Sequence, residues 1–262
     1  MQLFNKKGIK LRNVYSADNE VLSGAYRVDG TSIPFVEFFP SAILQVISSF
    51  SSTKNKQGAC TDGTYIYQYC DANAIIKYKI SDGTYNIVEL GSSITYGHGN
   101  DMTYNPYNNH IYIATMERDG SVIELDTDLN YITTRYIVGK NGNPYPVWGI
   151  CFDKNEKKYY SEVDSNRIAF YDEDFNYLGW VLSPHPNSTA QGFETDGLFL
   201  YRLTYNPNTV YVTDMMGNEV CTIEVPMTGE PEGIMYDWLS GKFYVSRNST
   251  TGIFYEMWIK DN

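Results

Sequence analysis

Several ingredients of common functional sites are scarce in this sequence. It has only three histidines and four cysteines in 262 residues. The cysteines, Cys60, Cys70, Cys151 and Cys221, show no CxxC or other zinc-type spacing. P-loop, GxGxxG and GxSxG motifs are also missing. We therefore expect four reduced, partly buried thiols, no metal and no cofactor.

Positive charge is in deficit as well. Against 31 Asp and Glu residues there are 20 Lys and Arg residues, giving a formal net charge of −11. A chain this acidic repels nucleic acid and an anionic membrane surface. The longest apolar run, around Ala42 to Ile47, is far too short to span a bilayer, and the amino terminus shows no signal peptide. The sequence predicts no nucleic-acid partner and no membrane insertion.

Helical periodicity is nearly absent, and short alternating runs of Tyr, Ile, Val and Thr take its place. Turn-forming pairs separate these runs: Asp62-Gly63, Asp82-Gly83, Asp119-Gly120, Asn141-Gly142 and Asp196-Gly197. The hydrophobic fraction, 42%, is sufficient for a full core. This pattern is typical of an all-β protein.

One unit repeats along the chain. Five segments open with one residue followed by glycine and continue as an alternating strand. They open at Gln57, His98, Trp148, Gln191 and Glu232. Apart from the last, the units hold about four short antiparallel strands in roughly 40–45 residues, which is the pattern of a propeller blade. We predict a five-bladed β-propeller over residues 41–262.

The last unit is too short for a full blade. The alternating segment from Ser41 to Ser52 is the natural donor of the missing strand, and we expect it to pair with the C-terminal blade and close the ring. Residues 1–40 are too few to fold alone. They are predicted to form an attachment or oligomerisation arm, or alternatively an ordered tail that caps the propeller.

The repeat also defines a candidate ligand site. Gln57, His98, Trp148, Gln191 and Glu232 should stand at matching places near the mouth of the central channel. This mixture suits a hydroxylated ligand better than a metal ion, which needs several converging His, Cys or carboxylate ligands. The alternative is that these residues hydrogen-bond one another and join the blades.

Other residues add to the candidate site. Asn100 and Asp101 follow His98, although a turn role is the simpler account of Asp101. Tyr145, Trp148 and Trp180 are candidates for stacking against sugar rings.

Two segments, beginning at Asp126 and Asp172, resemble calcium-binding loops. Both lack the required glycine at the sixth position. They are therefore predicted to be hairpin turns.

The stretch GHGNDMTYNP, followed by IYIAT, and the recurring QG(F/A)xxD opening resemble the β-propeller of phage receptor-binding tail proteins and related teichoic-acid-associated proteins of Gram-positive bacteria. The resemblance covers about residues 41–262. It implies a non-catalytic, five-bladed platform that binds cell-wall glycopolymer or another surface sugar. It also implies a virion tail location after assembly in the host cytoplasm, a homo-oligomer with a trimer favoured, and attachment to other tail proteins through residues 1–40. The chain departs from the family in having no heptad stem and no module after the propeller.

Two alternatives remain open: an enzyme that cleaves or modifies a cell-wall glycan, and a purely structural tail or baseplate component. An enzyme needs two carboxyl groups, or a carboxylate beside a histidine, that converge on one face. Raised pKa values of Glu232 and Asp101 at such a face would weaken the binding-only hypothesis.

Overall fold

The computed structural model describes residues 3–4 and 10–11 as backbone, together with residues 41–51, 54–71, 73–92, 94, 96–164, 166–183, 189–249 and 251–260. Every regular element in these ranges is a β-strand, which confirms the expectation of an all-β chain. These ranges contain no helix long and apolar enough to cross a membrane. The predicted arm at residues 1–40 lies outside the described residues, except for a pairing of β1 (Leu3–Phe4) with β2 (Lys10–Leu11).

Three four-stranded antiparallel sheets have their strands in sequence order. The first contains β4 (Lys56–Thr61), β5 (Tyr65–Cys70), β6 (Ala74–Lys79) and β7 (Tyr85–Glu89). The second contains β8 (Asp101–Asn105), β9 (His110–Ala114), β10 (Ser121–Asp126) and β11 (Tyr131–Tyr136). The third contains β12 (Gly149–Asp153), β13 (Lys158–Asp164), β14 (Arg167–Tyr171) and β15 (Tyr177–Leu182).

The remaining strands form one eight-stranded sheet. Its first half is β16 (Thr189–Thr195), β17 (Phe199–Tyr205), β18 (Thr209–Asp214) and β19 (Glu219–Glu224). Its second half is β3 (Ser41–Ser51), β22 (Thr251–Lys260), β21 (Lys242–Asn248) and β20 (Glu230–Asp237). A single parallel pair, Glu224 with Ser41, joins the halves.

The strand β3 comes from the amino-terminal side of the chain but completes a sheet made by the carboxyl-terminal side. It runs antiparallel to β22 from Ser51 opposite Thr251 to Ser41 opposite Lys260. The predicted pairing of the segment from Ser41 with the C-terminal blade is therefore confirmed for Ser41–Ser51. The pairing covers an edge of β22 that would otherwise be open.

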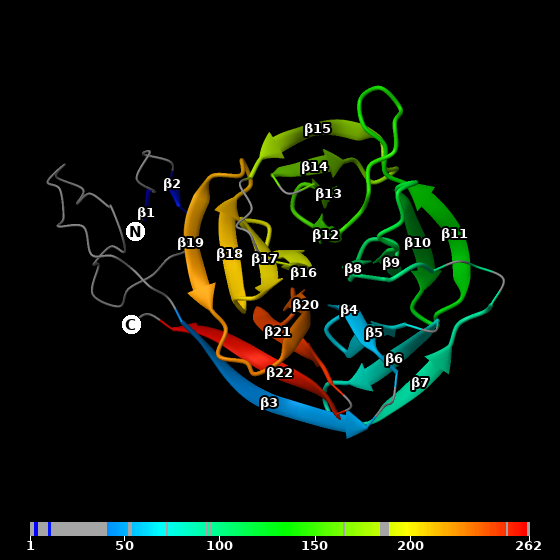
Figure 1. The fold of residues 1–262 in the computed structure, drawn as a ribbon, viewed down its shortest axis with the longest axis vertical. Helices are drawn as coiled ribbons and strands as arrows, with labels where there is room; N and C mark the ends of the chain where they lie inside the picture. Colours follow the sequence, from blue (N-terminus) through cyan, green and yellow to red (C-terminus); the bar gives the residue numbers. More distant parts are fainter. Residues whose placement is uncertain are drawn as a thin grey trace, which may run out of the picture.

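The sheets stand around a common centre. Figure 1 shows β4, β8, β12, β16 and β20 closest to this centre, with β7, β11, β15, β19 and β3 on the outer rim. Each inner strand contacts the next, and β20 contacts β4 again. The result is a propeller-like fold in which the first strand of each repeat lines the middle.

The inner strands approach one another so closely that glycine is needed between them. A Cβ atom on Gly58 of β4 would lie 2.2 Å from the Cα atom of Asp101 in β8. A Cβ atom on Gly233 of β20 would lie 2.9 Å from the main-chain nitrogen of Ala59. The repeated glycines therefore allow backbone to pack directly on backbone at the centre.

The second repeat differs from its predicted alignment. β8 begins at Asp101, so His98 and Gly99 lie in the turn before the strand. The hairpins close at equivalent pairs, Asn105 with His110 in one sheet and Asp153 with Lys158 in the next. Counting back from these pairs places Asp101, rather than Gly99, at the position of Gly149. The alignment of His98 with Gln57 and the other unit-opening residues was therefore wrong.

The turn and cysteine predictions hold in the described residues. The glycines of all five turn-forming pairs have positive φ angles, between 74° at Gly83 and 85° at Gly63. This is the conformation that the second residue of such a turn requires and that glycine adopts without strain. Cys60, Cys70 and Cys151 are buried free thiols, and Cys221 is a partly buried one.

Candidate functional site

The candidate site lies at the end of the ring where the inner strands begin. Gln57 stands in β4, Gln191 in β16 and Glu232 in β20, and each is less than 5% exposed. Because the second strand of each sheet runs antiparallel to the first, its last residues return to this end. Asp71 therefore follows β5 at the same end, beside Lys56, which pairs with Cys70.

Glu232 is a strongly perturbed acid at this end. Burial raises its pKa, the neighbouring Glu230 and Asp71 carboxylates raise it further, and a hydrogen bond with Asn248 opposes them; the resulting pKa is about 9. Its side chain therefore carries a proton at neutral pH. A neutral carboxyl group can donate that proton to a bound molecule.

A carboxylate–histidine pair stands at the same end. His98 Nδ1 lies 3.3 Å from Asp71 Oδ1, and 46% of the His98 side chain is exposed. Two amides fix the other oxygen of Asp71: Asn55 Nδ2 donates at 2.9 Å and Gln57 Nε2 at 3.4 Å. The turn that carries His98 is itself held by its main-chain N–H, which donates to the Thr115 carbonyl at 3.0 Å.

Gln191 makes a matching contact on the opposite side of Glu232. Its Nε2 donates to Glu230 Oε1 at 2.9 Å. Both glutamines predicted at the channel mouth therefore orient carboxylates. Asp71 and Glu230, which they orient, were not predicted from the sequence.

Asp101 has a different position. It is fully buried, and its Oδ2 accepts hydrogen bonds from the main-chain N–H groups of Ile150 at 2.9 Å and Phe193 at 3.1 Å. Because β8 thereby contacts both β12 and β16, the side chain joins three inner strands across the centre. Burial raises its pKa well above its usual value, and Glu194 and Glu162 add to the effect. This placement fits the joining of blades rather than contact with a ligand from solvent.

Asn100 and Trp148 also connect neighbouring sheets. Asn100 Nδ2 donates to the Trp148 carbonyl at 2.6 Å, and the Trp148 main-chain N–H donates to the Glu162 carbonyl at 3.0 Å. Asn100 is 6% exposed, so its amide is mainly occupied within the fold. The five residues predicted to form one ring therefore fall into two groups. Some make polar contacts at the mouth, and Trp148 makes contacts that join the sheets.

The two remaining predicted residues lie together, but on the rim. The guanidinium of Arg167 lies 5.5 Å from the ring centre of Tyr145 and 5.9 Å from that of Trp180. Trp180 belongs to β15, which Figure 1 places on the outer edge. This aromatic pair is separate from the carboxyl groups at the centre.

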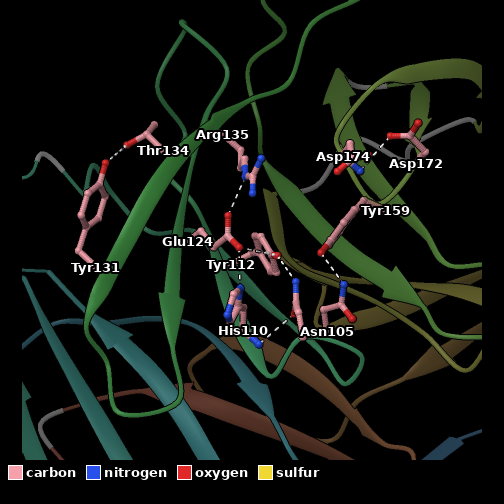
Figure 2. Close-up of polar contacts among 11 residues, drawn as sticks. Asn105, His110, Tyr112, Glu124, Tyr131, Thr134, Arg135, Tyr159, Asp172 and Asp174 are labelled. Carbon is pink, nitrogen blue, oxygen red and sulfur yellow. Dashed lines mark hydrogen bonds and ion pairs between the residues drawn. The ribbon is translucent and has the colours of Figure 1, made fainter.

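A second polar cluster surrounds Glu124 (Figure 2). His110 Nδ1 lies 2.6 Å from its Oε1, Tyr112 donates to the same atom at 3.0 Å, and Arg135 Nε donates to Oε2 at 2.6 Å. Burial raises the pKa of Glu124, but these hydrogen bonds outweigh it and leave the pKa below its usual value. His110 belongs to this cluster, whereas His98 lies beside Asp71, so these two histidines have different partners.

The segments that resemble calcium loops are turns, as predicted. Asp126 accepts from the main-chain N–H of Asn130 at 2.8 Å and from its side-chain amide at 2.9 Å, and Asp172 binds Asn176 in the same way. Figure 2 also shows the bond from the Asp174 main chain to Asp172. Within the described ranges there is no group of three or more His, Cys, Asp or Glu side chains that could hold a metal ion.

The positions of Asp71 and Glu230, which were not predicted, could have been inferred from the order of the strands. Asp71 directly follows the second strand of its repeat, so an antiparallel hairpin returns it to the side of Gln57. Glu230 lies two positions before Glu232, at the start of β20. Both placements can be predicted when the first two strands of a repeat are considered together as a hairpin, and not the inner strand alone.

No family model matches this chain, and no curated protein sequence matches it. Solved structures with a similar fold include the glutaminyl cyclase of Myxococcus xanthus, with a TM-score of 0.66 and 13% identity over 86% of this chain and 99% of that one. A luciferin-regenerating enzyme has a TM-score of 0.54 and 10% identity over 83% of this chain and 95% of that one. Regucalcin of Agrobacterium tumefaciens, described as a calcium-binding protein, has a TM-score of 0.51 and 13% identity, with coverages of 84% and 97%.

These findings correct two expectations. The resemblance to phage tail proteins was wrong, because the similar structures are a glutaminyl cyclase, a luciferin-regenerating enzyme and regucalcin, and no tail-protein family matches. The expectation of a protein without enzymatic activity, which rested on that resemblance, is contradicted by the enzymes among these structures. At identities this low the likeness shows the fold alone. The chain therefore has a β-propeller fold, and its chemistry has to be argued from its own residues.

Proposed function

We propose that this chain is an enzyme that performs general acid–base catalysis at the end of the ring that carries Gln57, Gln191 and Glu232. The observation that carries the proposal is the protonated Glu232, with its pKa of about 9, close to the Asp71–His98 pair. Acid–base catalysis at neutral pH usually needs two titratable groups, one that donates a proton and one that accepts a proton. Their different surroundings set these roles.

The two groups have distinct roles. The Asp71 carboxylate, whose Oδ1 lies 3.3 Å from His98 Nδ1, favours the tautomer with the hydrogen on Nδ1 and leaves Nε2 as a proton acceptor. Glu232 donates its proton to the substrate, at the oxygen or nitrogen atom that departs as the leaving group or that gains electrons in the reaction. Asn55 and Gln57 hold the Asp71 carboxylate in place, which keeps the imidazole oriented. The partial exposure of His98 leaves it open to a molecule that enters from solvent.

The proposal includes a blade count of five over residues 41–262. Five inner strands surround the centre, and the eight-stranded sheet divides naturally at its single Glu224–Ser41 pair. β3 would then be the outer strand of the blade formed by β20, β21 and β22.

Recognition of a cell-wall glycan stays a prediction, and cleavage or modification of such a glycan is one reaction that the two groups could catalyse. Oligomerisation through residues 1–40 also stays a prediction. A second substrate for testing is a peptide with an amino-terminal glutamine, because the fold is similar to that of a glutaminyl cyclase.

The test is turnover on purified cell wall and on a glutaminyl peptide, measured for wild type and single variants. Glu232→Gln and His98→Asn should each lower kcat by about 100-fold or more. Glu219→Gln, an exposed acid on the outer strand β19, is the matched control and should leave kcat unchanged. Activity should fall as pH rises through about 9, because Glu232 loses its proton there. Unchanged kcat in Glu232→Gln, or no turnover on either substrate, would contradict the proposal.

A further inference from the structure

The groups at the site are unusually rich in hydrogen-bond acceptors. Asp71, Glu230 and Glu232 bring three carboxyl groups to one end of the ring, and the first and second of these raise the pKa of the third. The Nε2 groups of Gln57 and Gln191 already donate to Asp71 and Glu230. Each glutamine therefore has its amide oxygen left to offer, which is again an acceptor.

Two buried groups beside the site lack a partner. Gln68 is fully buried and donates from Nε2 to the Gln57 carbonyl at 3.2 Å, while its Oε1 has no hydrogen-bond partner. Ser246 is also fully buried, and its Oγ has no partner. A buried acceptor without a donor is costly, so each such group requires an explanation, and a bound molecule that supplies the donor is one.

Both unpartnered groups lie where β4 meets β20. Gln68 is the cross-strand partner of Ala59, and Ser246 is the cross-strand partner of Gly233. Those partners touch, because a Cβ atom on Gly233 would lie 2.9 Å from the Ala59 nitrogen. The contact directly adjoins Gln57 and Glu232, so the unpartnered atoms belong to the same end of the ring as the three carboxyl groups.

The two neighbouring lysines contact protein groups and not the mouth of the ring. Lys56, next to Gln57, is 1% exposed, and its Nζ donates to the carbonyls of Lys54 and Ser249 at 2.9 and 2.6 Å. Lys54 pairs with Glu89, and Arg247 donates to the Thr228 carbonyl and the Ser249 hydroxyl. Lys54 and Lys56 are therefore committed to protein partners, whereas the buried Nε of Arg247 has no hydrogen-bond partner among the described residues.

We infer that the molecule bound at this end carries a positively charged amino group, which donates its hydrogen bonds to the Glu230 and Asp71 carboxylates and to one of the amide oxygens of Gln57, Gln191 and Gln68. This inference rests on the proposed function, because it names the substrate class of the same site. An ammonium group supplies three donors and a positive charge, which matches an acceptor-rich, acidic surface. A phosphate or carboxylate would meet repulsion from Asp71 and Glu230.

The test compares three molecules of nearly equal shape: benzylamine, benzyl alcohol and benzoate. Their binding to the full chain is measured at pH 7 by ligand-observed NMR titration, which needs no turnover. Benzylamine should bind at least about tenfold more tightly than the alcohol, as expected for one charge-assisted contact. Benzoate should bind most weakly, and added salt should reduce the preference for the amine.

Single variants test which residues produce the preference for benzylamine. Glu230→Gln should reduce the preference for benzylamine by about tenfold, whereas Glu219→Gln should leave it unchanged. Gln68→Leu should weaken the binding of benzylamine, and circular dichroism confirms that each variant is folded. Equal binding of the amine and the alcohol, undetectable binding of the amine, or an unchanged preference in a folded Glu230→Gln variant overturns the inference.

The outcome is separable from that of the proposed function. If Glu232→Gln abolishes turnover but amine and alcohol bind equally, the acid–base proposal stands and the substrate class is wrong. If the amine is preferred through Glu230 but neither test substrate is turned over, the binding inference stands without the catalytic one.

Discussion

The contact of Asp101 with two other inner strands predicts a large and specific loss of stability on its removal. Asp101→Ala leaves the buried main-chain N–H groups of Ile150 and Phe193 without an acceptor. Each unsatisfied group costs about 1–3 kcal/mol, so the free energy of unfolding should fall by about 2–6 kcal/mol. Asp101→Asn keeps one oxygen for both N–H groups and should lose less than about 2 kcal/mol.

The measurement is urea-induced unfolding at 25 °C, followed by circular dichroism, for both variants and wild type. Asp128→Ala, in an exposed turn, is the control and should stay within about 0.5 kcal/mol of wild type. A loss below 1 kcal/mol in Asp101→Ala would refute the idea that this side chain joins the inner strands.

The pH dependence gives an independent check of the same side chain. The pKa of Asp101 is raised in the folded protein, chiefly by burial. Its protonated form therefore contributes stability that is complete below the unfolded pKa of about 3.9 and is lost as pH rises through the folded value. Asp101→Asn does not titrate, so the advantage of wild type over this variant should shrink as pH rises. A constant difference between pH 4 and pH 9 would contradict this assignment.

Two further predictions concern stability. Glu124→Gln places an amide donor against the Arg135, His110 and Tyr112 donors. The free energy of unfolding, measured with urea at pH 7, should fall by about 1–3 kcal/mol. This range allows for the partial exposure of Arg135, which weakens its contact with Glu124. Because the pKa of Glu124 is lowered in the fold, this difference should be complete above an unfolded pKa of about 4.3 and disappear as pH falls through the folded value; a difference that grows in acid would argue against the network. Gly58→Ala forces β4 and β8 apart and should cost about 3 kcal/mol or more, measured by thermal unfolding. Gly142→Ala meets no atom within 4 Å but has a positive φ, so it should cost only about 1–2 kcal/mol; equal losses in the two variants would show that crowding at Gly58 is unimportant.

Part of the candidate site was visible in the sequence because it follows from the strand repeat. Gln57, Gln191 and Glu232 open their repeats and do stand at one end of the ring. His98 was found for the wrong reason, since its turn precedes β8, yet the turn brings it to Asp71. The assignment to tail proteins relied on a short motif whose Asp101 and Asn100 have structural contacts, and such contacts carry no information about function.

Local features of the sequence specify the strands, their turns and the closing segment, because alternation of side chains and Asp-Gly turn chemistry act over a few residues. Which polar groups meet depends on how the sheets pack together. Asp71 reaches His98, and Asp101 reaches Ile150 and Phe193, through the packing of separate sheets. The protonation of Glu232 likewise depends on its burial beside Glu230 and Asp71. Burial and proximity across sheets are properties of the whole ring, and no local pattern of residues encodes them.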